Sequence, residues 1–228
     1  IFAFAIYDKK ENILFCARDQ LGVKPFYYQY INGVFYFASE VKSILCSGIQ
    51  MDLDKNRVGE YMVFGHVAGE NTLFKNIYKL LPGHYLKVNN NLEIKKYWSI
   101  YDYNKTVNGS DLIGKLNNGI KKQMISDVPI GTMCSGGLDS SGLTSVVSKL
   151  TEKSQLKTFS IGFKDLKYNE SHYSELVSDY VNSDHHCIFS EPESFWGDLP
   201  KTVWLHDEPL LHANSVPMYQ ISMYAKKF

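Results

Sequence analysis

The sequence has no long hydrophobic run and no excess of charge of either sign. Its longest apolar stretches, such as residues 1–7, are far shorter than the roughly 20 residues that a membrane-spanning helix needs. The 24 Lys and Arg residues balance the 24 Asp and Glu residues, so electrostatics favours no nucleic acid or other polyanion as a partner. We therefore expect neither a membrane protein nor a nucleic-acid-binding protein.

Cysteine is scarce, and no two cysteines stand in a CxxC spacing. Scattered cysteines suit neither a disulfide-rich secreted domain nor a zinc site, so we expect a cytoplasmic protein whose thiols stay reduced. Their expected role is that of small, buried apolar side chains. The four cysteines are Cys16, Cys46, Cys134 and Cys187.

An initial methionine is also lacking. The chain begins with Ile1 inside a strand pattern and ends with Phe228 inside a helical pattern, so we expect an internal fragment of a longer protein. Apolar material is plentiful, since 44% of the residues are hydrophobic and 14% are aromatic. That proportion is typical of a folded chain, and the length of 228 residues lies between one domain and two.

The first hundred residues have the pattern of antiparallel strands. Short aromatic and β-branched runs predict strands at residues 1–7, 13–17, 25–31 and 34–38. Asn32-Gly33 separates the last two runs, and both central positions of a type I′ turn need positive φ, so we expect a β-hairpin there. A further strand pair is predicted at residues 83–88 and 92–98. Short helices are predicted at residues 39–45 and 54–62, the second capped by Asp54.

From about residue 110 the apolar period changes from two to about 3.6. The polar stretch 102–110 is therefore the expected linker between a domain at residues 1–101 and a domain at residues 102–228. One helix face of the second domain is predicted to carry Leu112, Leu116, Ile120 and Met124. A later one is predicted to carry Tyr173, Leu176, Val177 and Tyr180.

The second domain alternates between strands and helices. Strands are predicted at residues 128–134, 156–163 and 185–189, and helices at residues 141–150, 171–181 and 193–205. Such alternation indicates a parallel sheet covered by helices.

Residues 135–141, Ser-Gly-Gly-Leu-Asp-Ser-Ser, lie between a predicted strand and a predicted helix. Adjacent glycines let the backbone approach phosphate oxygens, and the start of the helix offers unpaired N–H groups. The hydroxyls of Ser135, Ser140 and Ser141 add further donors. A carboxylate beside phosphates repels them unless a divalent cation lies between, so Asp139 indicates Mg²⁺. We expect nucleotide phosphates to bind here.

The alternative is an ordinary tight turn in which Asp139 or Ser140 only caps a helix. The loop also differs from the GxxxxGK[ST] phosphate loop, because it has no lysine. That difference favours contacts centred on pyrophosphate, with AMP as the transferred group.

Residues 135–141 resemble the PP-loop of AMP-forming ATP pyrophosphatases. Other segments resemble one branch of that group, the glutamine-dependent asparagine synthetase family. In the second half these segments are residues 127–131, 159–163 and 207–209. In the first half, residues 18–28, 37–42 and 81–86 resemble the later part of the family's class II glutaminase domain. The resemblance covers essentially the whole chain, with both domains in the family's order.

The resemblance implies a fold of mixed α/β and α+β type. Residues 1–101 would be the C-terminal part of an N-terminal-nucleophile α/β/β/α sandwich. Residues 102–228 would be the first part of a doubly wound, parallel PP-loop domain. The implied enzyme is a cytoplasmic ligase of asparagine biosynthesis, a homodimer, that adenylates the side-chain carboxylate of aspartate with ATP and Mg²⁺. Ammonia from glutamine then displaces AMP.

The resemblance also implies roles for individual residues. Those expected to bind ATP through its pyrophosphate part are Ser135, Gly136, Gly137, Asp139, Ser140 and Ser141, with Asp139 reaching Mg²⁺. Met133, Ile161 and Gly162 match places where the family contacts adenosine. Simple core packing explains Met133 and Ile161 equally well.

Two parts of the family's machinery are not in this sequence. The nucleophilic cysteine and the glutamine-binding residues of the family lie upstream of Ile1, and none of the four cysteines is a substitute. The second glycine-rich acidic motif of the pyrophosphate site falls beyond Phe228. We therefore expect no catalytic residue within the fragment and no synthesis by the fragment alone.

The acceptor is less well defined by the sequence. Residues 206–215 lie near where asparagine synthetases carry polar and cationic residues linked to aspartate, but here the stretch includes apolar residues. His212, Asn214 and Ser215 are the candidates for binding the acceptor, and a solvated loop is the alternative for His212. Two rival functions follow: a related amidotransferase acting on another carboxylate, and a non-catalytic remnant that binds nucleotide.

Overall fold

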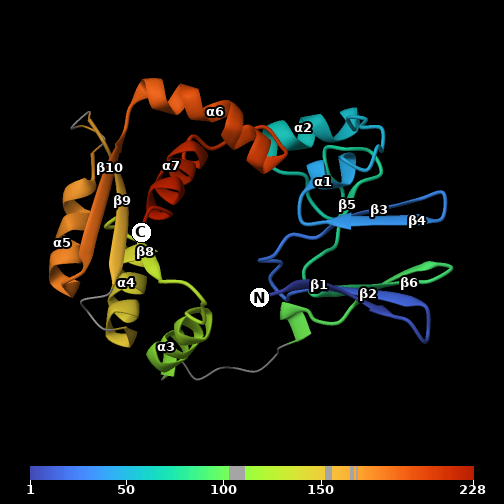
Figure 1. Ribbon diagram of the computed structural model, residues 1–228, viewed down its shortest axis with the longest axis horizontal. Helices are drawn as coiled ribbons and strands as arrows, with labels where there is room; N and C mark the ends of the chain where they lie inside the picture. Colours follow the sequence, from blue (N-terminus) through green and yellow to red (C-terminus); the bar gives the residue numbers. More distant parts are fainter. Residues whose placement is uncertain (103–110, 152–155, 165–166, 168) are drawn as a thin grey trace. The chain divides into compact units, whose positions relative to one another are not determined.

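The computed structural model describes residues 1–102, 111–151, 156–164, 167 and 169–228 (Figure 1). The chain forms two compact units. Unit 1 comprises Ile1–Thr106 with Asp207–Leu211, and unit 2 comprises Val107–His206 with His212–Phe228. Apart from Asp102, the expected linker at residues 102–110 lies outside the described residues.

Unit 1 contains two antiparallel sheets. The first has the order β1-β2-β6-β7, with β1 (Ala3–Asp8), β2 (Ile13–Arg18), β6 (His84–Val88) and β7 (Leu92–Lys96). The second has the order β4-β3-β5, with β3 (Tyr27–Ile31), β4 (Val34–Ala38) and β5 (Tyr78–Lys79). The predicted hairpin is confirmed, because Ile31 pairs with Val34 and the φ angles of Asn32 and Gly33 are 52° and 75°.

The two sheets of unit 1 lie over one another (Figure 1), and residues from both form one apolar core. Cys16 and Leu86 come from the first sheet, and Phe26 and Tyr28 come from the second sheet and the turn before it. Burying large aromatic side chains contributes most of the stabilisation of such a core. Strand β6 alternates as a half-buried strand should, whereas β2 and β3 each bury two consecutive residues.

Both helices predicted in the first half are present. They are α1 (Val41–Leu45) and α2 (Lys55–Phe64), and the Asp54 side chain accepts a hydrogen bond from Asn56 N as a cap. A short 3₁₀ turn at Ile100–Asp102, η1, was not predicted. Cys16 and Cys134 are fully buried as expected, but Cys46 is exposed because it caps the end of α1.

Residues Asp207–Leu211 belong to unit 1, which the sequence did not predict. Asp207 Oδ2 accepts a hydrogen bond from Val41 N at 2.7 Å, and Asp207 Oδ1 lies 3.0 Å from Lys42 Nζ. The Asp207 carboxylate therefore caps α1, whose own N-cap residue, Glu40, makes no side-chain cap bond. The Tyr61 hydroxyl donates to Pro209 O, which holds the segment beside α2.

Unit 2 is built on a parallel sheet of order β10-β9-β8, as the alternation predicted. Its strands are β8 (Gly131–Met133), β9 (Lys157–Phe163) and β10 (Asp184–Ser190). Its helices are α3 (Leu112–Gln123), α4 (Leu138–Leu150), α5 (Ser171–Val181), α6 (Pro192–His206) and α7 (Ser215–Ala225). The helical pattern noted at the end of the chain is confirmed as α7, although its bounds were not predicted. Strand β8 is shorter than the predicted strand at residues 128–134.

Helices α5 and α7 cover opposite faces of this sheet (Figure 1). His185 and His186 are neighbours on β10 and so point to opposite faces. His185 lies 3.4 Å from the Ser174 hydroxyl of α5, whereas the His186 ring packs against Tyr224 of α7. The sheet therefore presents a polar face to α5 and an aromatic face to α7.

The predicted apolar face of α5 is wrong, although the helix itself is confirmed. Tyr173, Leu176 and Tyr180 are exposed, whereas the buried residues of α5 are Ser171, Ser174, Ser178 and Val181. The reason lies in the sheet, because β9 and β10 turn hydroxyl and imidazole groups toward α5. Small hydroxyl side chains match those groups, and a stripe of tyrosine and leucine does not.

The predicted face of α3 is buried only in part. Ile120 is buried and Met124 packs beside it, together with Val147 and Leu156. Leu112 and Leu116, which the pattern places on the same face, are exposed. Only the last turns of α3 therefore contribute to the core of unit 2.

Candidate functional site

The loop at residues 135–141 follows β8 directly and leads into α4. Its two ends are fixed to the sheet and the helix. Cys134 N donates to Phe159 O at 2.8 Å, which continues the pairing of β8 with β9. The Thr144 hydroxyl donates to Thr132 Oγ1 at 3.1 Å, which ties α4 to β8. The loop is thus held between a strand end and a helix start.

Gly136 is required by packing against α5. Its φ angle is +82°, in the region that favours glycine. A Cβ atom here would lie 2.4 Å from Tyr173 Cβ and 2.8 Å from Ser174 N. Gly137 differs, because its φ is −72° and a Cβ would meet only Ser135 Oγ, at 3.4 Å. Of the two glycines, Gly137 is therefore the one that keeps the open side of the loop free of side-chain atoms.

The hydroxyls of Ser135 and Ser140 meet inside the loop. Their Oγ atoms are 2.9 Å apart, Ser140 Oγ donates to Gly137 O at 3.1 Å, and Ser135 Oγ accepts from Gly137 N at 3.3 Å. Ser135 N also donates to Ser140 Oγ at 3.2 Å. The two serines thus hold the loop in shape by bonding to each other and to its backbone.

The start of α4 supplies the donors for an anion. Ser141 N makes the first bond of the helix ladder, to Gly137 O at 3.0 Å. The N–H groups of Leu138, Asp139 and Ser140 are therefore outside the ladder, at the positive end of the helix dipole. Ser141 Oγ is buried and has no hydrogen-bond partner among the described residues. A loop with open amides and an unsatisfied hydroxyl fits a phosphate group.

Asp139 is exposed in the first turn of α4. Among the described residues, no cluster of three or more His, Cys, Asp or Glu side chains could hold a metal ion. Magnesium in nucleotide sites is commonly held by one or two carboxylates together with the phosphates. The single carboxylate of Asp139 therefore fits a magnesium ion that reaches the protein together with a polyphosphate.

A pocket of about 420 Å³ lies beside this loop in unit 2. Met133 and Ile161, two of the three residues expected to contact adenosine, line it, as do Ser135 of the loop and Phe159. Its size is within the range of small-molecule sites. Gly162 is the third residue expected to contact adenosine. Its lack of a side chain leaves space for Asn169 and Phe189, because a Cβ there would lie 2.8 Å from Asn169 Oδ1 and 2.9 Å from Phe189 Cε1.

One wall of the pocket is the edge of β9. Phe159 O points toward β8 and accepts from Cys134 N. Alternate residues of a strand direct their backbone groups to the same edge, so Ile161 points its N–H and C=O there as well. Since β8 ends at Met133, these groups face the pocket beyond the strand end. Ligands of parallel α/β sheets bind in this position, outside the carboxyl ends of the strands.

The three candidate acceptor residues lie just before and at the start of α7. Asn214 lines the pocket, together with Met218 and Ile221 of α7. His212 is exposed, and its carbonyl accepts from Ser215 N at 3.2 Å. The structure therefore brings Asn214 to the same pocket as Met133 and Ile161. Sequence patterns did not single out Ser160 or Ser174, which also line it.

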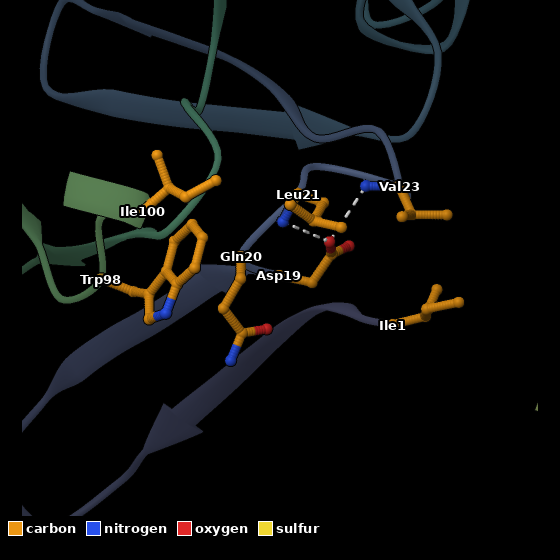
Figure 2. Close-up of a pocket in the computed structure, with 7 residues that line it drawn as sticks. All are labelled: Ile1, Asp19, Gln20, Leu21, Val23, Trp98 and Ile100. Atoms are coloured by element: carbon orange, nitrogen blue, oxygen red, sulfur yellow. Dashed lines mark hydrogen bonds between the residues drawn. The ribbon is translucent and has the colours of Figure 1, made fainter. Parts of the chain in front are cut away.

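Unit 1 has a pocket of its own, shown in Figure 2, at the turn after β2. Asp19 Oδ1 accepts from Leu21 N and Val23 N at 3.1 and 3.0 Å, and Asp19 Oδ2 accepts from Lys24 N at 3.0 Å. Burial opposes the charge of Asp19, but these bonds prevail and lower its pKa to about 2. Figure 2 shows the carboxylate turned into the turn, so it shapes the backbone.

Cys16 lies in the core of unit 1, and burial raises the pKa of its thiol to about 12. A thiol with that pKa is protonated at neutral pH and is a poor nucleophile. Cys16 is therefore a small, buried core side chain of unit 1.

Among the described residues, no helix is both long and apolar enough to cross a membrane.

Comparison with protein families gives two matches, one for each half of the chain. Residues 112–228 match the family model for asparagine synthase. Residues 1–98 match the family model for a glutamine amidotransferase domain. The loop at residues 135–141 and the pocket beside it fall within the first of these matches.

Similar curated proteins include enzymes named for the same family. A protein of Methanocaldococcus jannaschii called putative asparagine synthetase [glutamine-hydrolyzing] 2 is 38% identical over all of this chain, which spans 46% of that protein. Asparagine synthetase [glutamine-hydrolyzing] 1 of Bacillus subtilis is 32% identical over all of this chain and 37% of its own length. Amidase chyE of Penicillium rubens is 26% identical over 94% of the chain and 35% of its own length. The chain thus spans about half the length of the first of these relatives and less of the other two. The chain belongs to the asparagine synthase family.

Proposed function

We propose that the full-length protein containing this chain is a glutamine-hydrolysing asparagine synthetase. Residues 1–101 would be the later part of its α/β/β/α glutaminase sandwich. Residues 102–228 would be the first part of its doubly wound PP-loop domain, although residues 207–211 pack in unit 1. The observation that carries the proposal is the loop at residues 135–141, with its open amides beside a pocket at the carboxyl ends of β8 and β9. Relatives named for this activity match both units.

In this proposal the loop binds the β- and γ-phosphates of ATP. The N–H groups of residues 138–140 donate to phosphate oxygens, and charge-assisted bonds of this kind contribute roughly 1.5–3 kcal/mol each. Ser135 and Ser140 keep the loop in the conformation that aims those donors outward. The same donors stabilise pyrophosphate as it leaves the α-phosphorus, because they are fixed before the reaction begins.

The pocket binds the adenosine part of ATP. The backbone edge of Ile161 offers one donor and one acceptor to the base, while Met133 and Phe159 cover its face. Magnesium, held by Asp139 and the phosphates, would supply positive charge that offsets the negative charge on the leaving pyrophosphate.

Asn214 and Ser215 lie where the proposal places the acceptor carboxylate, with His212 just before them. An oxygen of that carboxylate attacks the α-phosphorus, so pyrophosphate leaves and an acyl-adenylate forms. Ammonia then attacks the acyl carbon and AMP leaves. A carboxylate oxygen is a poor leaving group, and its attachment to AMP is what makes the amidation feasible.

The experiment is performed on the full-length protein. Pyrophosphate and asparagine are measured with ATP, Mg²⁺, aspartate and glutamine, and again with other carboxylic acids in place of aspartate. We expect pyrophosphate release that depends on aspartate. Release that depends on another acid instead would identify an amidotransferase of the same chemistry, and no release with any acid would favour a non-catalytic nucleotide-binding protein.

Asp139→Asn tests the magnesium role in the same assay. We expect pyrophosphate release to fall at least roughly 100-fold, because the loss of metal binding removes several kcal/mol of charge stabilisation. Glutamine hydrolysis should remain measurable. Glu193→Gln is the matched control, since Glu193 is likewise an exposed acidic residue in the first turn of a helix. Unchanged pyrophosphate release by the Asp139 variant would refute the role.

A further inference from the structure

His185 lies at the centre of a group of buried hydroxyls behind the pocket of unit 2. Its Nδ1 atom is 2.8 Å from Thr158 Oγ1, and its Nε2 atom is 3.1 Å from Ser160 Oγ and 3.4 Å from Ser174 Oγ. The three hydroxyl residues are at most 3% exposed. Two of them, Ser160 and Ser174, also line the pocket.

The contacts of Ser174 decide which ring nitrogen carries the proton. Ser174 Oγ donates its one hydrogen to Ser171 O at 2.6 Å, so toward His185 it can only accept. A neutral ring with its proton on Nδ1 would turn the lone pair of Nε2 toward the lone pairs of Ser174. A proton on Nε2 instead satisfies Ser160 and Ser174 together. Burial lowers the pKa of His185, which favours the neutral ring.

The rest of the group fits this tautomer. With its proton on Nε2, the ring accepts at Nδ1 from the Thr158 hydroxyl. Thr158 Oγ1 in turn lies 3.0 Å from Ser183 Oγ, which lies 2.8 Å from Ser178 Oγ. Each hydroxyl can then donate to the next in one direction, so that the chain of hydrogen bonds is consistent from Ser178 to His185.

The consequence concerns the hydroxyl hydrogen of Ser160. When Ser160 Oγ accepts from His185 Nε2, its own hydrogen is not used in that bond. Among the described residues, His185 is the only hydrogen-bond partner of Ser160 Oγ. Ser160 is among the residues that line the pocket, so the hydrogen is available to an acceptor atom of a bound molecule.

We propose that His185 is a positioning residue that fixes the Ser160 hydroxyl as a hydrogen-bond donor toward the nucleoside bound in this pocket. The inference rests on the proposed function for the nature of the ligand. The proposal also explains why serines of α5 face the sheet. Ser174 accepts a hydrogen bond from Nε2 of His185, and Ser178 continues the chain of hydroxyls that leads to Nδ1.

The tautomer is tested first, without any nucleotide. In the full-length protein labelled with ¹⁵N-histidine, the two ring nitrogens of His185 are assigned by their loss in a His185→Gln variant. We expect the proton on Nε2 and an unprotonated Nδ1 at neutral pH. A proton on Nδ1 would overturn the inference, because Ser160 would then donate to the ring.

Two substitutions of His185 then separate positioning from packing. The amide of glutamine reaches the place of Nε2, whereas the amide of asparagine reaches only the place of Nδ1. The dissociation constant of the α,β-methylene analogue of ATP is measured for each variant of the full-length protein. We expect Ser160→Ala and His185→Asn to weaken binding by a similar factor, roughly 3- to 10-fold, and His185→Gln to stay near the wild type.

The double variant completes the test. His185→Asn should weaken binding no further once Ser160→Ala is present, because both act through one hydrogen bond. Equal losses in the glutamine and asparagine variants would instead indicate a packing role and overturn the inference. A wild-type protein that does not bind the analogue would overturn the proposed function and this inference with it. Wild-type binding that His185→Asn leaves unchanged would overturn this inference alone.

Discussion

Replacement of Gly136 by alanine should destabilise the loop together with α5. The alanine methyl would lie 2.4 Å from Tyr173 Cβ, 2.6 Å from Tyr173 C and 2.8 Å from Ser174 N. Two of these three atoms belong to the helix backbone, so the overlap cannot be relieved by rotating a side chain. The φ of +82° adds the strain that any residue with a Cβ experiences there.

The magnitude follows from these two terms. Left-handed backbone costs about 1–2 kcal/mol for an alanine, and overpacking of a tight contact costs about 1–3 kcal/mol. Together they lower the local stability of this region by about 2–5 kcal/mol. A change of that size raises the population of locally opened states roughly 30-fold to several-thousand-fold.

Hydrogen–deuterium exchange of the full-length protein measures this opening directly. Peptides from β8, α4 and α5 should exchange faster in Gly136→Ala by that factor, while peptides of unit 1 keep their rates. Gly137→Ala is the matched control, because its φ of −72° suits alanine and its Cβ would meet only Ser135 Oγ at 3.4 Å. Wild-type exchange rates in the Gly136 variant would refute the reasoning.

Gly136→Asn separates the two terms. Asparagine tolerates positive φ better than alanine does, but its Cβ meets the same atoms of α5. We expect exchange in Gly136→Asn to be nearly as fast as in Gly136→Ala. If asparagine restored the wild-type rates, backbone strain alone would account for the glycine and the close contact with α5 would not.

Three further predictions concern unit 1. The folded pKa of Asp19, about 2, lies below its ordinary value of 3.8, so its stabilisation of about 2 kcal/mol is present above pH 4 and is lost as the pH falls toward 2. Asp19→Asn should abolish that part of the acid sensitivity in urea titrations, and an unchanged pH dependence would exclude the assignment. In the native protein, iodoacetamide should alkylate exposed Cys46 long before buried Cys16, and peptide mapping that finds equal rates would contradict the core position of Cys16. Gly33→Ala should lower the free energy of unfolding by roughly 1–2 kcal/mol through its φ of 75°, and an unchanged urea midpoint would argue against the type I′ turn.

The sequence determined those features that depend on short-range chemistry. Asn32-Gly33 predicted a hairpin because few residues adopt positive φ, and Asp54 predicted a helix cap because its side chain can reach the N–H of Asn56. Alternating strands and helices predicted the parallel sheet of unit 2. The string at residues 135–141 predicted a loop between strand and helix, and its resemblance to known PP-loops indicated the family.

Only the tertiary structure decided which side of each element is buried. The Tyr173, Leu176 and Tyr180 stripe of α5 has the correct period for a helix, but burial depends on what the neighbouring strands present. Here they present His185 and buried hydroxyls, so the serines of α5 face inward. Likewise, the sequence identified Gly136 as a loop glycine, while its contact with α5 appears only when two distant segments meet. Local propensities act over a few residues, and such contacts are set by the packing of the whole unit.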